Sequence, residues 1–197
     1  MPRKTKQKRK IKEKGNYEKC WDYLKESWIY FTTIFFLFLI STSIGILFPI
    51  FLKETISKIL GEIVKETSDM NFFELLIFIW KNNISTAFFG MILGVILGIF
   101  PVLIALFNGY VLGFVAKESI GIGGYLVLIR LLPHGIFEIP ALVISLGLGL
   151  KLTRFVFSSE PKKQLKYDLE NSLRVFLYVV IPLLLIAGII ETILIFI

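Results

Sequence analysis

The residues with the clearest potential for chemistry lie in a segment that is otherwise apolar enough to cross a membrane. His134, the only histidine of the chain, and Glu138 fall within Leu131 to Leu152, and Arg130 directly precedes this segment. Ionisable groups at membrane depth cost about 2.5–3.5 kcal/mol each on insertion scales, so they are candidates for functional sites. His134 and Glu138 are four residues apart, and on a helix they would share one face.

Two polar residues in other apolar segments extend this set. The predicted buried polar cluster consists of Asn108, Arg130, His134, Glu138 and Glu191. Three interpretations stay open: a structural network that locks helices together, a metal site, or a proton or ion path. The metal site would use His134, Glu138 and Glu191, because imidazole and two carboxylates can hold Zn²⁺ or another divalent ion.

Motifs for nucleotide binding and catalysis are absent from the sequence. The chain has no GxxxxGK[ST] and no HExxH motif, and the glycines around Gly123 do not form a phosphate-binding fingerprint after a strand. The one histidine has no nucleophile at a recognised spacing, and Cys20, the single cysteine, excludes an internal disulfide. We therefore expect no catalytic residues and no enzymatic activity.

Composition indicates the fold class. The 197 residues are 55% hydrophobic and 19% charged, and the mean hydropathy is +0.76. Soluble domains are less apolar and more charged, and several apolar runs here are long enough to span a bilayer. The sequence predicts an all-α, polytopic membrane protein with about five transmembrane helices and additional interfacial amphipathic helices.

Hydrophobic patterning predicts the boundaries of the segments. Residues 1–15 are rich in Lys and Arg and predict a disordered tail, and 16–28 predict an amphipathic helix with its aromatic residues at headgroup level. A membrane domain would cover 29–197. Its predicted spans are about 29–52, 84–100, 101–117, 124–152 and 175–197.

The segment between the first two predicted spans is amphipathic. At helical spacing, residues 53–71 place apolar side chains on one face and Lys and Glu side chains on the others, which is typical of an amphipathic helix outside the membrane. Asn71 and Glu74 have the spacing of a helix N-cap. Phe72 to Trp80 is short for a span and is followed by Lys81-Asn82-Asn83, so we expect it to lie in the interface.

Small residues predict where helices approach closely. Residues with this predicted packing role are Gly90, Gly94, Gly98, Gly109, Gly113, Ala141, Ser145 and Gly149. The ridge Gly90, Gly94 and Gly98 could also join two copies of the chain in a homodimer. Pro101 and Pro133 predict helix breaks, and Pro133 either starts a helix or kinks one.

The distribution of charge predicts the orientation. The net charge is +7, and the basic residues gather in 1–15 and in 151–174. Basic segments stay on the cytoplasmic side, so this pattern predicts a multi-pass plasma-membrane protein with its N-terminus inside and its C-terminus outside. The tail would bind anionic lipid headgroups. An apolar segment follows the tail so closely that we expect no nucleic-acid partner.

Three segments together resemble a known family. LLPHGIFEIPALVIS, GMILGVILGIFPVLIALFNGYVLG and PLLLIAGIIETIL are similar to the stage II sporulation protein M (SpoIIM-like) membrane proteins, over most of residues 28–197. The matching positions are Asn108, Gly109, Pro133, His134, Gly135, Glu138 and Glu191. In spore formers the resemblance implies a polytopic protein of the engulfment machinery, which holds peptidoglycan-degrading partners at the membrane. Relatives also occur in archaea and in other organisms that make no spores.

The resemblance favours a non-enzymatic scaffold or assembly subunit of a membrane complex, with other membrane proteins as partners. Two alternatives stay open. One is an ion or small-solute transporter or channel-like protein that uses an intramembrane ion site of His134, Glu138 and Glu191. The other is a metal-dependent membrane hydrolase that uses the same residues.

Overall fold

The structure, a computed structural model, describes the backbone of residues 15–124 and 128–197 and their side chains except those at 128–134. This described part is predominantly helical and contains no β-strand. The helices are α1 Asn16–Glu26, α2 Trp28–Leu47, α3 Lys53–Thr67, α4 Phe72–Ile92, α5 Ile99–Gly123, α6 Leu128–Leu152, α7 Pro161–Val175 and α8 Ile181–Phe196. Short 3₁₀ turns follow α4 and α6, and a π-helical turn joins α7 to α8. The predicted tail at 1–15 lies outside the described residues except for Gly15.

The helices confirm the predicted fold class. In the described part of the chain, five helical stretches are long and apolar enough to cross a membrane. They are Trp28–Leu47, Phe72–Val95, Ile99–Ile122, Gly135–Phe157 and Pro161–Phe196. The protein is thus an all-α polytopic membrane protein, with α1 and α3 as additional amphipathic helices.

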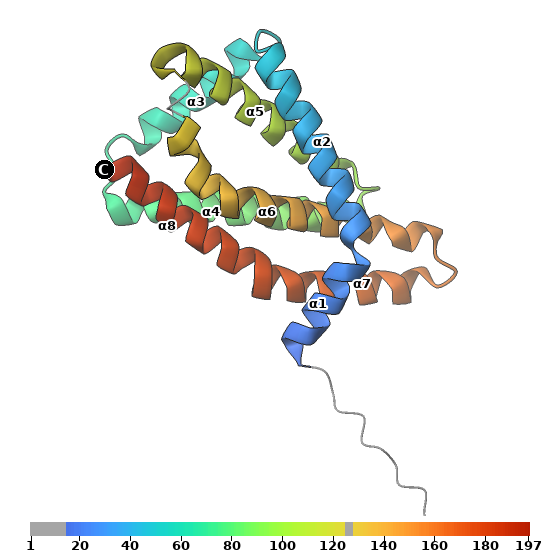
Figure 1. Ribbon diagram of the computed structural model, residues 1–197. Helices are drawn as coiled ribbons and strands as arrows, with labels where there is room; N and C mark the ends of the chain where they lie inside the picture. Colours follow the sequence, from blue (N-terminus) through green and yellow to red (C-terminus); the bar gives the residue numbers. More distant parts are fainter. Residues whose placement is uncertain (1–14, 125–127) are drawn as a thin grey trace, which may run out of the picture.

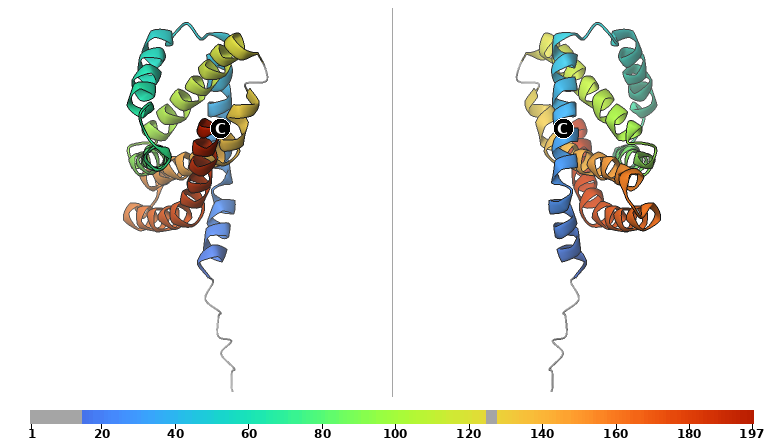
Figure 2. Two further views of the ribbon diagram at one scale, coloured as in Figure 1. Left: turned by 90° about the vertical axis from the view of Figure 1, so that its left-hand side faces the viewer. Right: turned by 90° about the vertical axis from the view of Figure 1, so that its right-hand side faces the viewer.

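The bundle has two distinct ends (Figures 1 and 2). At one end, which we call the basic end, α1 packs against α7 and the 153–157 turn, and Arg154 pairs with Glu26 at 2.9 Å. At the opposite end lie α3, the start of α4 and the C-terminus, where the rings of Phe72 and Phe196 are 5.6 Å apart. Helix α1 and the basic segment after α6 therefore lie at the same end of the bundle, and the orientation in the cell stays a prediction.

Helix α6 occupies the centre of the bundle. It packs against α2, α4, α5, α7 and α8, and its fully buried residues include Ala141, Ser145 and Leu146. The small residues of α6 face α4: Ser145 Oγ donates a 2.8 Å hydrogen bond to the Ala87 carbonyl oxygen, and Gly149 lies against the backbone at Gly90. The backbones approach so closely because neither helix has a bulky side chain at these positions.

The glycine ridge of α4 is used inside the chain. A Cβ at Gly90 would collide with the Leu146 side chain, and one at Gly94 would collide with the backbone of Gly149. Gly98 is not part of the α4 helix: it adopts the left-handed conformation (φ +67°) that starts α5. Gly90 and Gly94 therefore contact α6 of the same chain, whereas the homodimer stays a prediction.

Helices α2 and α5 form a second close pair. Gly109 and Gly113 of α5 lie against the backbone of α2 at Phe38 and Thr42, while Gly45 of α2 lies against the Tyr110 carbonyl of α5. Ser41 Oγ donates a hydrogen bond to the Leu106 carbonyl oxygen across the same interface. Amphipathic α3 covers the far end of this pair, where Ile56 packs against Tyr110 and Phe114.

The first half of α4 differs from the prediction. Phe72 to Trp80 is not a separate interfacial segment, because α4 continues through Lys81-Asn82-Asn83 to Ile92. The predicted N-cap is confirmed: Asn71 Oδ1 accepts hydrogen bonds from the backbone of Phe73 and Glu74, at 3.0 and 3.1 Å. Tertiary contacts keep the helix continuous, since Trp80 Nε1 donates to the Leu185 carbonyl of α8 at 3.1 Å.

The prolines act differently from each other. The connection between α4 and α5 has positive φ at Leu97 and Gly98, and Pro101 lies in the first turn of α5, where its missing N–H costs no hydrogen bond. Helix α6 begins at Leu128 and so does not start at Pro133. Figure 1 shows instead that α6 bends in its first half, the part that contains Pro133 and Pro140.

Replacing Gly113 by alanine tests the close packing of α2 and α5. The added Cβ would meet the Thr42 carbonyl oxygen far inside van der Waals contact, so we expect a loss of about 1–3 kcal/mol in unfolding free energy. The measurement is reversible denaturation of the purified protein in detergent. Gly61→Ala on α3 is the matched control, because nothing lies within 4 Å of a Cβ there. Equal stability of Gly113→Ala and wild type would contradict the packing.

Candidate functional site

The described members of the predicted polar cluster come from three helices. Asn108 lies on α5, Glu138 on α6 and Glu191 on α8, and all three side chains are partly buried. The side chains of Arg130 and His134 lie outside the described residues, so their positions relative to Glu138 are not part of the structure. Asn108 and Glu138 line the same cavity, whereas Glu191 is not among its described lining residues.

The cavity has predominantly polar walls. It lies between α4, α5, α6 and α8, and Leu142 and Leu184 complete its walls. Its described polar lining residues are Asn82, Asn83, Thr86, Asn108 and Glu138. The volume of about 30 Å³ is enough for about two water molecules, since one water needs roughly 10–15 Å³ on this measure. The space suits water or a single small ion, not an organic solute.

The α4 side of this cavity consists of residues outside the predicted polar cluster. Lys81-Asn82-Asn83 was interpreted as the end of an interfacial segment, but the continuous α4 helix brings Asn82 and Asn83 into a bundle cavity. Thr86 follows at helical spacing on the same face. A polar triplet inside an otherwise apolar helix was the signal that could have placed these residues.

Glu138 and Glu191 are two carboxyl groups on neighbouring helices. Both side chains are partly buried, and α6 packs against α8. Two carboxylates in a partly dehydrated site destabilise each other unless a proton or a cation is shared. The described residues contain no cluster of three potential metal ligands, but His134 is outside that part, so the metal set His134, Glu138 and Glu191 stays a prediction.

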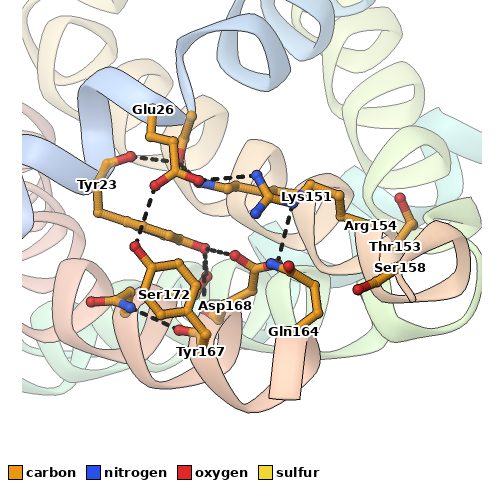
Figure 3. Close-up of polar contacts among 12 residues, drawn as sticks. Tyr23, Glu26, Lys151, Thr153, Arg154, Ser158, Gln164, Tyr167, Asp168 and Ser172 are labelled. Atoms are coloured by element: carbon orange, nitrogen blue, oxygen red, sulfur yellow. Dashed lines mark hydrogen bonds and ion pairs between the residues drawn. The ribbon is translucent and has the colours of Figure 1, made fainter. Parts of the chain in front are cut away.

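A second polar site, at the basic end, was not recognised from the sequence. Lys151 is fully buried near the end of α6 (Figure 3). Its Nζ donates to Ser27 Oγ at 2.9 Å, lies 3.2 Å from Glu26 Oε1, and sits 3.6 Å from the centroid of the Tyr23 ring. A buried ammonium needs such partners because it has left the solvent that would otherwise stabilise it.

Asp168 of α7 is the buried anion of the same site (Figure 3). It accepts hydrogen bonds from Tyr23 Oη at 3.1 Å and Gln164 Nε2 at 2.7 Å, and lies 3.7 Å from Arg154 Nε. Arg154 also reaches Glu26 at 2.9 Å. The network thereby connects α1, the end of α6 and α7; we call Tyr23, Glu26, Ser27, Lys151, Arg154 and Asp168 the basic-end network.

The basic-end network and burial shift the pKa values of three side chains of α1. Burial alone would raise the pKa of Glu26, but its ion pairs with Lys151 and Arg154 outweigh burial and lower the pKa below its ordinary value. Burial raises the pKa of Tyr23, which keeps its hydroxyl protonated as a donor to Asp168. Burial also raises the pKa of the Cys20 thiol, so that cysteine acts as a small apolar core residue.

The sequence contained only a weak signal for this network. Lys151 and Arg154 were interpreted as the start of a basic cytoplasmic loop, although Lys151 lies within the apolar run of α6. For the helix at 16–28, the spacing of the sequence predicts an apolar face of Tyr17, Cys20, Trp21, Leu24 and Trp28. The structure buries Cys20 and partly buries Leu24, but it leaves Tyr17, Trp21 and Trp28 exposed. The buried residues of α1 and its end are Cys20, Tyr23 and Ser27, which follow each other at three- and four-residue spacing.

The fold and the two polar sites define a class: a multi-helix membrane protein whose buried charges join its helices. Residues 34–194 match the family described as stage II sporulation protein M. The chain belongs to this family, as the resemblance in the sequence indicated.

A relative from an archaeon is similar over part of its length. An uncharacterized protein of Methanocaldococcus jannaschii is 33% identical over 136 residues, which cover 66% of this chain and 60% of the relative. The chain therefore aligns with less than two thirds of that relative. No solved structure matches the chain.

Substitution of Lys151 by methionine tests the basic-end network. Methionine fills a similar volume but leaves Glu26 and Ser27 without their buried cation, so we expect a loss of about 2–3 kcal/mol in unfolding free energy. Lys163→Met is the matched control, because its ion pair with Glu160 is exposed and should contribute less than about 1 kcal/mol. Denaturation in detergent measures both variants, and equal losses would contradict a special role for Lys151.

The lowered pKa of Glu26 predicts a specific pH dependence. A carboxyl with a depressed pKa in the folded state stabilises the fold fully above its ordinary pKa of 4.5, and this contribution disappears as the pH falls through the lowered value. We expect the wild type to lose stability below pH 4.5 more steeply than Glu26→Gln, measured as thermal unfolding from pH 7 to pH 3. Parallel curves for the two proteins would show that Glu26 does not contribute.

Proposed function

We propose that this protein is a non-enzymatic scaffold or assembly subunit of a membrane complex. The observation that carries the proposal is the basic-end network, which fixes the amphipathic helix α1 to α6 and α7. A helix that only lay in the headgroup region would not need a buried ion pair. Fixed in this way, α1 presents one constant surface to its surroundings.

The outward surface of α1 suits contact with a partner or with lipid headgroups. Tyr17, Trp21 and Trp28 are 72%, 60% and 63% exposed, and Lys25 Nζ lies 5.3 Å from the Trp21 ring. Tryptophan and tyrosine are enriched both at membrane interfaces and in the energetic centres of protein interfaces. The exposed lysines of α7 lie at the same end and would attract anionic headgroups.

The polar cavity supports a scaffold over a carrier of organic solutes. Its volume of about 30 Å³ is far below the roughly 300–1,000 Å³ of a typical small-molecule site. The family resemblance implies a role of the same kind, in which a membrane protein holds other proteins.

Crosslinking from α1 in native membranes tests the proposal. With the photoreactive amino acid benzoyl-phenylalanine in place of Trp21, we expect a discrete crosslinked protein that is absent when the probe replaces the outward Ile189 of α8. The same crosslink should be lost or strongly reduced when Lys151→Met is added, because α1 is then no longer held in place.

Reconstitution into proteoliposomes tests the alternative function, which is transport. Purified protein in proteoliposomes should show no saturable flux of Na⁺, K⁺, protons or small organic solutes above empty liposomes. A saturable flux that Glu138→Gln abolishes, together with no crosslink specific to α1, would overturn the scaffold role in favour of transport.

A further inference from the structure

The polar cavity is lined by side chains that carry oxygen atoms, and such atoms can bind a cation. The described polar groups that line it are three amides, one hydroxyl and one carboxyl, and none of them is cationic. They come from α4, α5 and α6, so anything bound among them would connect three helices. Carboxylate, amide and hydroxyl oxygens are the ligands that hard cations prefer.

The hydrogen bonds within the cavity walls leave oxygen atoms for a ligand. Asn108 Nδ2 donates to the Ile104 carbonyl oxygen of its own helix at 2.9 Å, so Oδ1 is the atom that Asn108 can offer. On α4, Asn82 Nδ2 lies 3.4 Å from Asn83 Oδ1, which leaves the second lone pair of that oxygen and the whole of Asn82 Oδ1. Thr86 adds a hydroxyl on the same face of α4.

The electrostatics of the cavity favour a positive ligand. Glu138 is partly buried in the bundle, and Glu191 is a second partly buried carboxyl on α8, which packs against α6. Repulsion between two carboxylates grows as water is excluded, and a cation between or beside them removes it. The volume of about 30 Å³ holds one cation with a water molecule.

We propose that this cavity binds one hard cation, of the Na⁺ or Ca²⁺ type, through the oxygen atoms of its walls. The bound ion joins α4, α5 and α6 and offsets the repulsion between Glu138 and Glu191. A divalent ion balances both carboxylates, and a monovalent ion balances the pair when one of them carries a proton. This site differs from the predicted zinc set, because it takes its ligands from α4 and α5 and needs no imidazole. It also does not depend on the scaffold role.

Cation-dependent thermal stability is the first test. Full-length protein is purified in detergent, stripped of metal by chelation, and melted in N-methylglucamine chloride with added Na⁺, Mg²⁺ or Ca²⁺ at constant ionic strength. We expect a saturable rise in Tm of about 5 °C at a hundredfold excess over Kd for at least one of these ions. Glu138→Gln should abolish the rise, whereas Glu170→Gln on the exposed face of α7 should keep it.

Two outcomes would overturn the proposal. One is the absence of a saturable rise with any of these ions, and the other is a rise that Glu138→Gln retains in full. A rise with Zn²⁺ alone would also overturn it, in favour of a site that includes His134.

Cysteine labelling keeps the test independent of the stability of Glu138→Gln. In a Cys20→Ala background, Leu142→Cys places a thiol in the cavity wall without removing an oxygen ligand. In chloride-free buffer, the cation should slow the reaction of this thiol with Ag⁺, an ion small enough for the cavity, at least several-fold, while Lys162→Cys on exposed α7 should react with Ag⁺ at the same rate with or without the cation. A labelling rate at Leu142→Cys that the cation does not change would contradict a bound ion.

Discussion

A charged group that leaves water must find compensating charges or dipoles inside the protein, and the bundle is arranged around this requirement. Lys151 is fully buried, yet a hydroxyl, a carboxylate and an aromatic face surround its ammonium group. Because these partners belong to the segment around α1, the requirement connects the start of the chain to the end of α6. The tyrosine and aspartate contacts extend the connection to α7.

Close helix packing provides the second constraint. In a bilayer, lipid tails compete with apolar side chains, so helices associate where small residues let their backbones approach. Here α6 meets α4, and α2 meets α5, through glycine, alanine and serine. The positions along α4 and α6 that lack this tight contact surround the polar cavity, so the same packing that joins the helices also leaves a small space for water or an ion.

The two polar sites suggest different tasks within one role. The basic-end network holds α1 as a fixed surface on the side that carries the basic segments. The cavity, deeper in the bundle, would use a cation to join the spanning helices to each other. Membership of the stage II sporulation protein M family is consistent with a protein whose residues mainly serve assembly. In the proposed scaffold role, a bound ion would strengthen the framework of helices.

The sequence by itself determined the fold class, the N-cap at Asn71 and the family, because long apolar runs, capping residues and motif segments are local properties of a chain. It also pointed to Glu138 and Asn108 as buried polar residues. Tertiary structure alone decided that Lys151 is a buried cation and not part of a solvated loop, and that α4 continues past Lys81-Asn82-Asn83. Both outcomes depend on partners far away in the chain: burial of a charge is stable only where distant groups converge on it, and no local pattern records that convergence.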